Sequence, residues 1–343
     1  MRKLLLTTTA LIAAGAISSA SLADVSISGS YKFEYQDYDS GITTAGASGD
    51  EMYSESSVTM KFSQKTDSGL TVGMHTTLTS EGTGVSGDAQ YDEHALTISG
   101  GFGKIQVGAD DGVGDQLTRS AHDIGVSSAH LHGDINSFHR TTTAGGGNLK
   151  DDNADLRDDI DDESNITYIL PKIGGLTAGI SIADKGDEAG ENNDETVFAA
   201  KYDFESNGVK GSLHYGQIKV DAATSTGAAL DGSTMAIDLT MGNIRAVYAT
   251  SETDVNATVT TEITDFGIQY NFGNGVEMSA IQTEVKENTG GETLDVTSIA
   301  ARYTIASGLT ASITYHDYDY AIGDSSETAD DGSATIFGIN ASF

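Results

Sequence analysis

The sequence contains no cysteine, no tryptophan and a single proline in 343 residues. Without cysteine there is no disulfide framework, no thiolate metal site and no cysteine nucleophile. Basic residues are scarce, because 18 lysines and arginines stand against 51 aspartates and glutamates, for a formal net charge of -33. A nucleic-acid binder neutralises phosphates with cations. So acidic a chain is therefore not expected to have a nucleic-acid partner.

Long apolar runs are also missing, apart from one close to the N-terminus. Arg2 and Lys3 precede an apolar stretch over residues 4–17, and small residues follow it. This stretch is shorter than the about 20 residues that a membrane-spanning helix needs. Its order of charge, apolar run and small residues is typical of a secretory signal peptide. We predict that residues 1–23 are cleaved on Sec-dependent export and that residues 24–343 form the mature domain.

The mature part of the chain alternates apolar and polar side chains with a period of two. Val25, Ile27 and Tyr31 share one face of the first such segment, whereas Lys32 and Glu34 point to the other. The pattern recurs about sixteen times, in segments of roughly ten residues, which is the length of a tilted strand that crosses a bilayer. Strands of soluble β-sandwiches are shorter, at about five or six residues.

Tight turns rich in glycine and asparagine alternate with longer polar connections, an asymmetry that is typical of membrane barrels. We therefore predict an all-β fold: a transmembrane antiparallel β-barrel of about 16 strands with short periplasmic turns and long extracellular loops. Rings on the apolar face gather at the short-turn end, at Tyr202, Phe204, Tyr270, Phe272, Tyr303 and Phe343. Four polar residues fall on the same nominal lipid face nearer the long loops: Asp92, His94, Gln282 and Glu284.

The third long connection, residues 111–163, is far longer than ordinary loops and is expected to fold into the lumen. A barrel of about 16 strands is too wide for wall side chains to fill, so its polar inner face should enclose water through which solutes diffuse. The excess of carboxylates favours cations in such a pore.

Charged residues at inward positions are candidates for a pore constriction with a transverse field. The acidic side comprises Asp110, Asp111, Asp115 and Asp123, at the start of the third loop. The basic wall comprises Lys32, Lys61, His75 and Arg302, and further inward positions hold Lys104, Lys201, Lys210, His214, Arg245 and His316. A wetted lumen face without a special role is the alternative.

The third loop also contains two candidate metal-binding groups. Calcium takes six to eight oxygen ligands, and the densest acidic run could supply them from Asp151, Asp152, Asp155, Asp158, Asp159, Asp161, Asp162 and Glu163. Its spacing is not that of an EF-hand, and a run of charges is usually a solvated surface without a bound ion. A transition metal could bind the loop histidines His122, His130, His132 and His139.

The segment SNITYILP at 164–171 continues through IGGL at 173–176, and GFGKIQVG lies at 101–108. The first resembles the sixth-strand, turn and seventh-strand signature of Gram-negative general porins of the alphaproteobacterial type, and the second is similar to the fourth turn and fifth strand of that family. The terminal Phe343 on an alternating strand resembles its assembly signal. The resemblance implies a 16-stranded, trimeric outer-membrane barrel whose third loop narrows the pore. It also implies contact with outer-membrane lipid and lipopolysaccharide, passage of small hydrophilic solutes, and no cofactor.

Two other functions fit the same fold. A receptor or adhesin would use the long acidic loops to bind an external partner and would conduct little. A barrel hydrolase would need a catalytic motif, and neither G-x-S-x-G nor H-E-x-x-H occurs in the sequence. The prediction is therefore a non-enzymatic porin.

Overall fold

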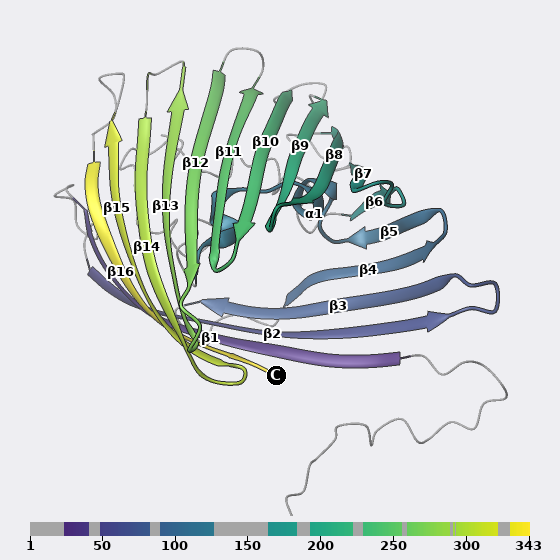
Figure 1. Cartoon of the computed structure of the whole chain (residues 1–343), viewed down its shortest axis with the longest axis horizontal. Coiled ribbons are helices and arrows are strands. Elements are labelled where there is room, and N and C mark those ends of the chain that lie inside the picture. Colours follow the sequence, from purple (N-terminus) through teal and green to yellow (C-terminus); the bar gives the residue numbers. More distant parts are fainter. Residues whose placement is uncertain are drawn as a thin grey trace, which may run out of the picture.

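The computed structural model describes residues 24–40, 49–82, 90–126, 164–183, 193–221, 229–255, 259–288, 291, 293–321 and 330–343. Sixteen antiparallel strands form one closed barrel (Figure 1). The first eight are β1 (Asp24–Ser40), β2 (Gly49–Lys65), β3 (Thr71–Gly82), β4 (Gln90–Gly100), β5 (Gly103–Ala109), β6 (Ser164–Ile169), β7 (Leu176–Ala183) and β8 (Asn193–Ser206). The second eight are β9 (Val209–Asp221), β10 (Leu230–Met241), β11 (Ile244–Val255), β12 (Val259–Asn271), β13 (Val276–Glu287), β14 (Thr293–Ala306), β15 (Leu309–Ala321) and β16 (Asp330–Ser342).

The barrel closes where the first strand meets the last. β1 pairs with β16 from Ser30 opposite Ser342 to Ser40 opposite Gly332. Beyond this ladder, the Phe343 amide donates to the Gly29 carbonyl at 2.9 Å, and the Gly29 amide donates back at 3.3 Å. Closure removes the two sheet edges, whose unpaired backbone groups hydrocarbon cannot satisfy. The predicted 16-stranded barrel is confirmed.

The apolar face of each strand points outward. Ile27 is 69% exposed and Ile339 is 51% exposed. Such exposure of large apolar side chains along whole strands suits a surface that contacts lipid rather than water. The two ring pairs predicted at the short-turn end are also present there: Tyr202 stacks on Phe204 with centroids 6.4 Å apart, and Tyr270 meets Phe272 edge-on at 4.5 Å.

Two short helices lie inside the barrel, α1 (Val113–Leu117) and the 3-10 helix η1 (Ala121–Ile124). Both belong to the third long loop, between β5 and β6. Figure 1 shows α1 within the ring of strands, and it packs against β7, β8 and β9. The predicted inward folding of this loop is confirmed for residues 111–126. None of the helices in the described ranges is long and apolar enough to cross a membrane.

The inner face is less polar than predicted. Val197 and Ile218, which point inward, are almost fully buried in one apolar cluster beneath α1. Val247 and Ile281 contribute to a second cluster beneath η1. The alternation rule identifies inward positions but not the ones that a folded-in loop covers, and covered positions can be apolar without contacting water.

A bulge corrects the predicted placement of Asp92. β3 pairs Thr76 with His94 but Leu78 with Tyr91, so β4 carries one extra residue between these pairs. The extra residue turns Asp92 to the inner face, where its carboxylate accepts a hydrogen bond from Thr79 at 2.7 Å. His94 stays on the outer face.

Gly308 in the β14–β15 turn is required both by its backbone angle and by a close approach. Its φ is +73°, and a Cβ there would lie 2.3 Å from the Ser342 carbonyl oxygen. Gly69 in the β2–β3 turn has a φ of +84°, but a Cβ there would have no other atom within 4 Å. Both glycines thus have a left-handed backbone, but only at Gly308 would a side chain collide with another strand.

We expect Gly308→Ala to destabilise the barrel more than Gly69→Ala does. Both changes place a Cβ in the left-handed region, at about 1–2 kcal/mol, but only the first also meets the closing strand. The temperature at which folded barrel loses its compact migration on SDS gels would measure this. Equal shifts for the two variants would contradict the role assigned to the close approach.

Candidate functional site

The third loop begins along the inner wall, not across the lumen. The Asn165 side-chain amide on β6 donates to the Asp110 carbonyl, and the Val113 amide at the start of α1 donates to the Ser181 hydroxyl on β7 at 2.7 Å. The Leu117 carbonyl, one turn later, meets Nδ1 of His214 on β9 at 2.7 Å. Within residues 110–117, the loop is thus hydrogen-bonded to three strands of the wall: β6, β7 and β9.

The His214 side chain holds the third loop against the wall and is shielded from water. Its ring is 4% exposed, with Nδ1 facing the Leu117 carbonyl and Nε2 2.7 Å from the Ser212 hydroxyl. Because a carbonyl can only accept, Nδ1 carries the hydrogen in this contact. His214 points inward, as predicted, and there it binds the third loop.

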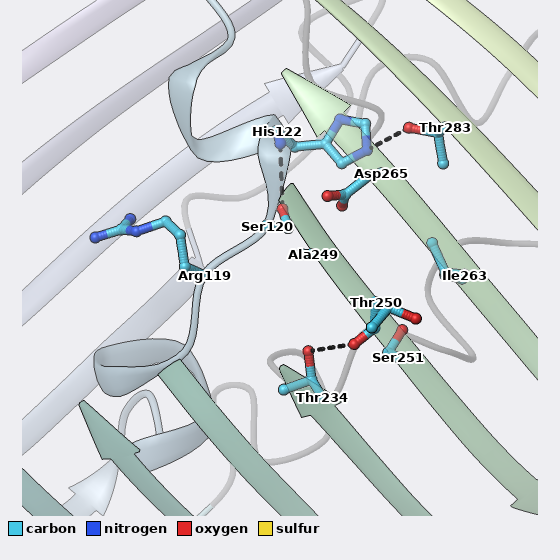
Figure 2. A pocket seen from close by; sticks show the side chains of 10 residues that line it. All are labelled: Arg119, Ser120, His122, Thr234, Ala249, Thr250, Ser251, Ile263, Asp265 and Thr283. Carbon is cyan, nitrogen blue, oxygen red and sulfur yellow. Dashed lines mark hydrogen bonds between the residues drawn. The ribbon is translucent and has the colours of Figure 1, made fainter. Parts of the chain in front are cut away.

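The 3-10 helix η1 is bound further along the wall, to β12 and β13. The Ala121 amide donates to Asp265 on β12 at 3.0 Å, and the Val126 amide donates to the Ser279 hydroxyl on β13 at 3.0 Å. Nε2 of His122 lies 2.9 Å from the Thr283 hydroxyl. Figure 2 shows this contact beside a small pocket, with the loop on one side and β10 to β13 on the other.

Asp123 closes the start of η1. Its carboxylate accepts from the Ser120 amide at 2.8 Å while the Ser120 hydroxyl accepts from the His122 amide at 3.2 Å, which forms a capping box. The capping box orients the Asp123 carboxylate, so the charge lies at a defined point on the loop.

Three inward glycines let the loop lie flat on the wall. A Cβ on Gly179 would lie 2.7 Å from Val113, and one on Gly216 would lie 2.7 Å from Thr118. On Gly267 it would lie 3.0 Å from the Ala121 Cβ. Glycine weakens a strand interior. Its recurrence beneath the loop is therefore explained by the close packing of the loop against the wall, which leaves no room for a side chain at these positions.

Ion pairs also connect the loop to the wall near η1. Arg119 on the loop lies 3.4 Å from Asp123 and 3.7 Å from Asp238 on β10. Arg245 on β11 binds both carboxylate oxygens of Asp238, the shortest contact being 2.6 Å. Alternating charges therefore run from the loop to the wall, and the bidentate Arg245 contact fixes their geometry.

The family model described as Gram-negative porin matches residues 7–343. The chain belongs to this family. Among curated protein sequences, none matches this porin.

Solved structures share the fold. The anion-selective porin from Comamonas acidovorans superimposes with a TM-score of 0.67 at 13% identity, covering 94% of this chain and 100% of that one. A triple mutant of the Rhodopseudomonas blastica porin gives 0.63 at 14% identity, covering 93% and 100%. A loop-deletion mutant of OmpT, an outer membrane protein of Vibrio cholerae, gives 0.64 at 13% identity, covering 94% and 99%. The porin fold is therefore shared at very low sequence identity.

The predicted acidic residues occupy different environments in this porin. Asp110 is 7% exposed and lies on the wall at the end of β5. Asp111 donates its amide to the Asp110 carboxylate at 3.0 Å, and Asp115 lies in the first turn of α1. The side chains of Asp111 and Asp115 are half-buried, as is that of Asp123 in its capping box.

The predicted basic wall is largely paired with acids. Lys32 lies 2.9 Å from Glu55 on the neighbouring strand, and its ammonium lies over the Tyr53 ring. Arg302 binds Glu277 close to the short turn before β13. These ion pairs reduce the net basic charge that the wall presents.

His75 and Lys61 are neighbours, facing each other in the register of β2 and β3, and Lys61 is exposed. His75 lies 3.2 Å from Asp110. The sequence pattern predicts His75 and Asp110 on opposing sides of the pore, but strands β3 to β5 bring them together.

Asp238, Arg119 and Glu93 were not predicted as site residues, and the structure places them among the charged groups of the lumen. Alternation within β10 marks Asp238 as inward, so a signal existed for that residue. The calcium candidates at 151–163, and His130, His132 and His139, lie outside the described residues. His122, the remaining histidine of that group, contacts Thr283.

Gly267→Val should displace the third loop. The three atoms nearest a Cβ at this position all belong to the loop, to Ala121 and Ile124, at 3.0–3.1 Å. We expect the loop to move toward the pore axis, with lower single-channel conductance and more open-channel noise. Gly73→Val is the matched control, because the three atoms nearest a Cβ at Gly73 belong to the wall strands β2 and β4. Unchanged conductance in a folded Gly267→Val barrel would contradict this packing of the loop against the wall.

Proposed function

We propose that this outer-membrane porin forms a water-filled channel for passive diffusion of small hydrophilic solutes and ions, with a preference for cations. The observation that carries the proposal is the course of the third loop. Its described part follows the wall from β7 to β13, held by Ser181, Asp265 and Ser279, and so narrows the lumen without crossing it. The proposal assigns the chain no catalytic step.

The charge along the third loop sets the sign of the selectivity. The Comamonas neighbour is described as anion-selective, so family membership does not determine the sign. Along the start of the third loop, Asp110, Asp111, Asp115 and Asp123 outnumber the single cation Arg119. Carboxylates at a narrow, low-dielectric passage raise the local concentration of cations.

Export and assembly belong to the same proposal. We assign residues 1–23 as the cleaved signal peptide and a homotrimer as the working assembly. β6 has 6 residues, and β5 and β7 have 7 and 8. At about 3.3 Å per residue and with tilt, such strands do not reach the about 25 Å of the apolar band. A neighbouring protomer covering this side of the barrel would keep it from lipid.

Conductance of the mature protein in a planar bilayer tests the channel. We expect large, steady steps and a zero-current potential of the cation-selective sign under a KCl gradient. Asp111→Asn combined with Asp115→Asn should lower the cation-to-anion permeability ratio by about twofold or more. Asp67→Asn, in the exposed β2–β3 turn, removes the same kind of charge away from the loop and should leave the ratio unchanged.

Folded barrels without conductance would overturn the channel itself and favour a receptor role for the long loops. An anion-signed potential would overturn only the cation preference.

Calcium binding by the acidic run at 151–163 is a separate part of the proposal. It is supported by the density of carboxylates in the sequence, which would repel one another unless solvated or bridged by a hard cation. Calorimetric titration of the folded porin with Ca²⁺ should release heat that disappears when Asp158, Asp159, Asp161 and Asp162 are changed to asparagine. A titration without heat above buffer would remove calcium from the proposal.

A further inference from the structure

Three potential metal ligands meet on the inner wall, from three neighbouring strands. Nε2 of His75 on β3 lies 3.2 Å from Oδ2 of Asp110, directly after β5, and 3.8 Å from Oε2 of Glu93 on β4. All three ligand atoms lie within 4.8 Å of one another, and no other such group of His and acidic residues occurs among the described residues. We infer that His75, Glu93 and Asp110 bind a divalent transition-metal ion of the zinc type.

The strand register holds the three residues together. β3 pairs His75 with Ala95, and β4 pairs His94 with Ala109. One step further along β4 and β5, Glu93 therefore stands across from Asp110. A cluster built on paired strands is more precisely positioned than one built on a free loop.

A close contact between β4 and β5 fixes the spacing beside the cluster. Gly108 has a φ of +148°, and a Cβ there would lie 2.2 Å from the His94 carbonyl oxygen and 2.7 Å from the Ala95 Cα. Only glycine allows the strands to approach this closely immediately before Asp110. Ala95, across from Gly108, is small and buried, which leaves room for the side chains of His75, Glu93 and Asp110 to converge.

Surrounding hydrogen bonds orient the two carboxylates. The Asp111 amide donates to Oδ1 of Asp110 at 3.0 Å, which leaves Oδ2 directed toward His75. The Thr77 hydroxyl donates to Glu93 at 3.4 Å. Such outer partners of metal ligands fix ligand orientation and raise metal affinity.

The distances fit a tetrahedral ion. Zn²⁺ binds imidazole nitrogen and carboxylate oxygen at about 2.0–2.2 Å, so its ligand atoms are separated by about 3.4 Å. The two distances from His75, 3.2 and 3.8 Å, lie on either side of that value. Imidazole suits zinc, copper and nickel, whereas calcium and magnesium prefer oxygen alone. Three protein ligands would leave a fourth position for water.

Charge and access also suit a dication. The side chains of His75, Glu93 and Asp110 are 19%, 31% and 10% exposed, so the cluster is partly desolvated yet reachable from the lumen. With a neutral imidazole, two carboxylates match the charge of one divalent ion. The nearby Lys104 ammonium binds the amide oxygens of Gln106 at 3.2 Å and Gln116 at 2.6 Å.

Binding is tested by calorimetric titration of the folded, EDTA-treated mature porin in detergent with ZnCl₂. To exclude the three loop histidines that lie outside the described residues, the parent protein carries His130→Gln, His132→Gln and His139→Gln. We expect one Zn²⁺ per chain, and at least about tenfold weaker affinity in His75→Gln and in Glu93→Gln. His94→Gln is the matched control, because His94 neighbours Glu93 but points outward. Compact migration on SDS gels confirms that each variant is folded.

Glu93→Gln separates a metal site from a simple ion pair, since it retains both His75 and Asp110. No zinc binding by the parent, or binding that both variants leave unchanged, would overturn the inference. Zinc should also lower the cation conductance of the parent but not of Glu93→Gln. This last readout rests on the proposed channel function, so zinc binding in a barrel that never conducts would refute the channel and leave the metal site standing.

Discussion

The requirement that every backbone polar group inside a membrane find a partner governs the whole architecture. Strands can satisfy it only in a closed ring, and closure here depends on the ladder between β1 and β16 together with the exchange between Gly29 and Phe343. A ring of sixteen strands then encloses more space than wall side chains can fill. Residues 111–126 of the third loop, their anchors on the wall and the charged groups around them all occupy that enclosed space.

The inner wall is shaped for the loop as much as for water. Glycines at 179, 216 and 267 remove side chains along the track of the loop, and apolar clusters lie beneath α1 and η1. Hydrogen bonds from the wall capture loop amides that would otherwise be unpaired at a buried site. Shape, apolar contact and polar pairing therefore agree on a single position for residues 111–126.

Much of the fold could be predicted because it depends on a local pattern. A period of two in residues such as Val25, Ile27 and Tyr31 fixes which face meets lipid, and turn residues such as Gly308 fix where strands end. Contacts that depend on register between strands could not be predicted. The proximity of His75 to Asp110 requires β3, β4 and β5 to be aligned, and the inward turn of Asp92 requires a bulge that no local signal announces. The apolar inner positions likewise depend on the loop that covers them.

The anchors of the third loop carry a consequence for the order of folding. The partner of Val113, Ser181, lies 68 residues later in the chain, whereas the partners of Ala121 and Val126 lie 144 and 153 residues away. Contacts so distant in sequence form slowly, because long segments must first be brought together. The loop can therefore dock only after most of the barrel has assembled, from its α1 end toward its η1 end. The nascent barrel would pass through a stage in which its interior is wider than that of the finished protein.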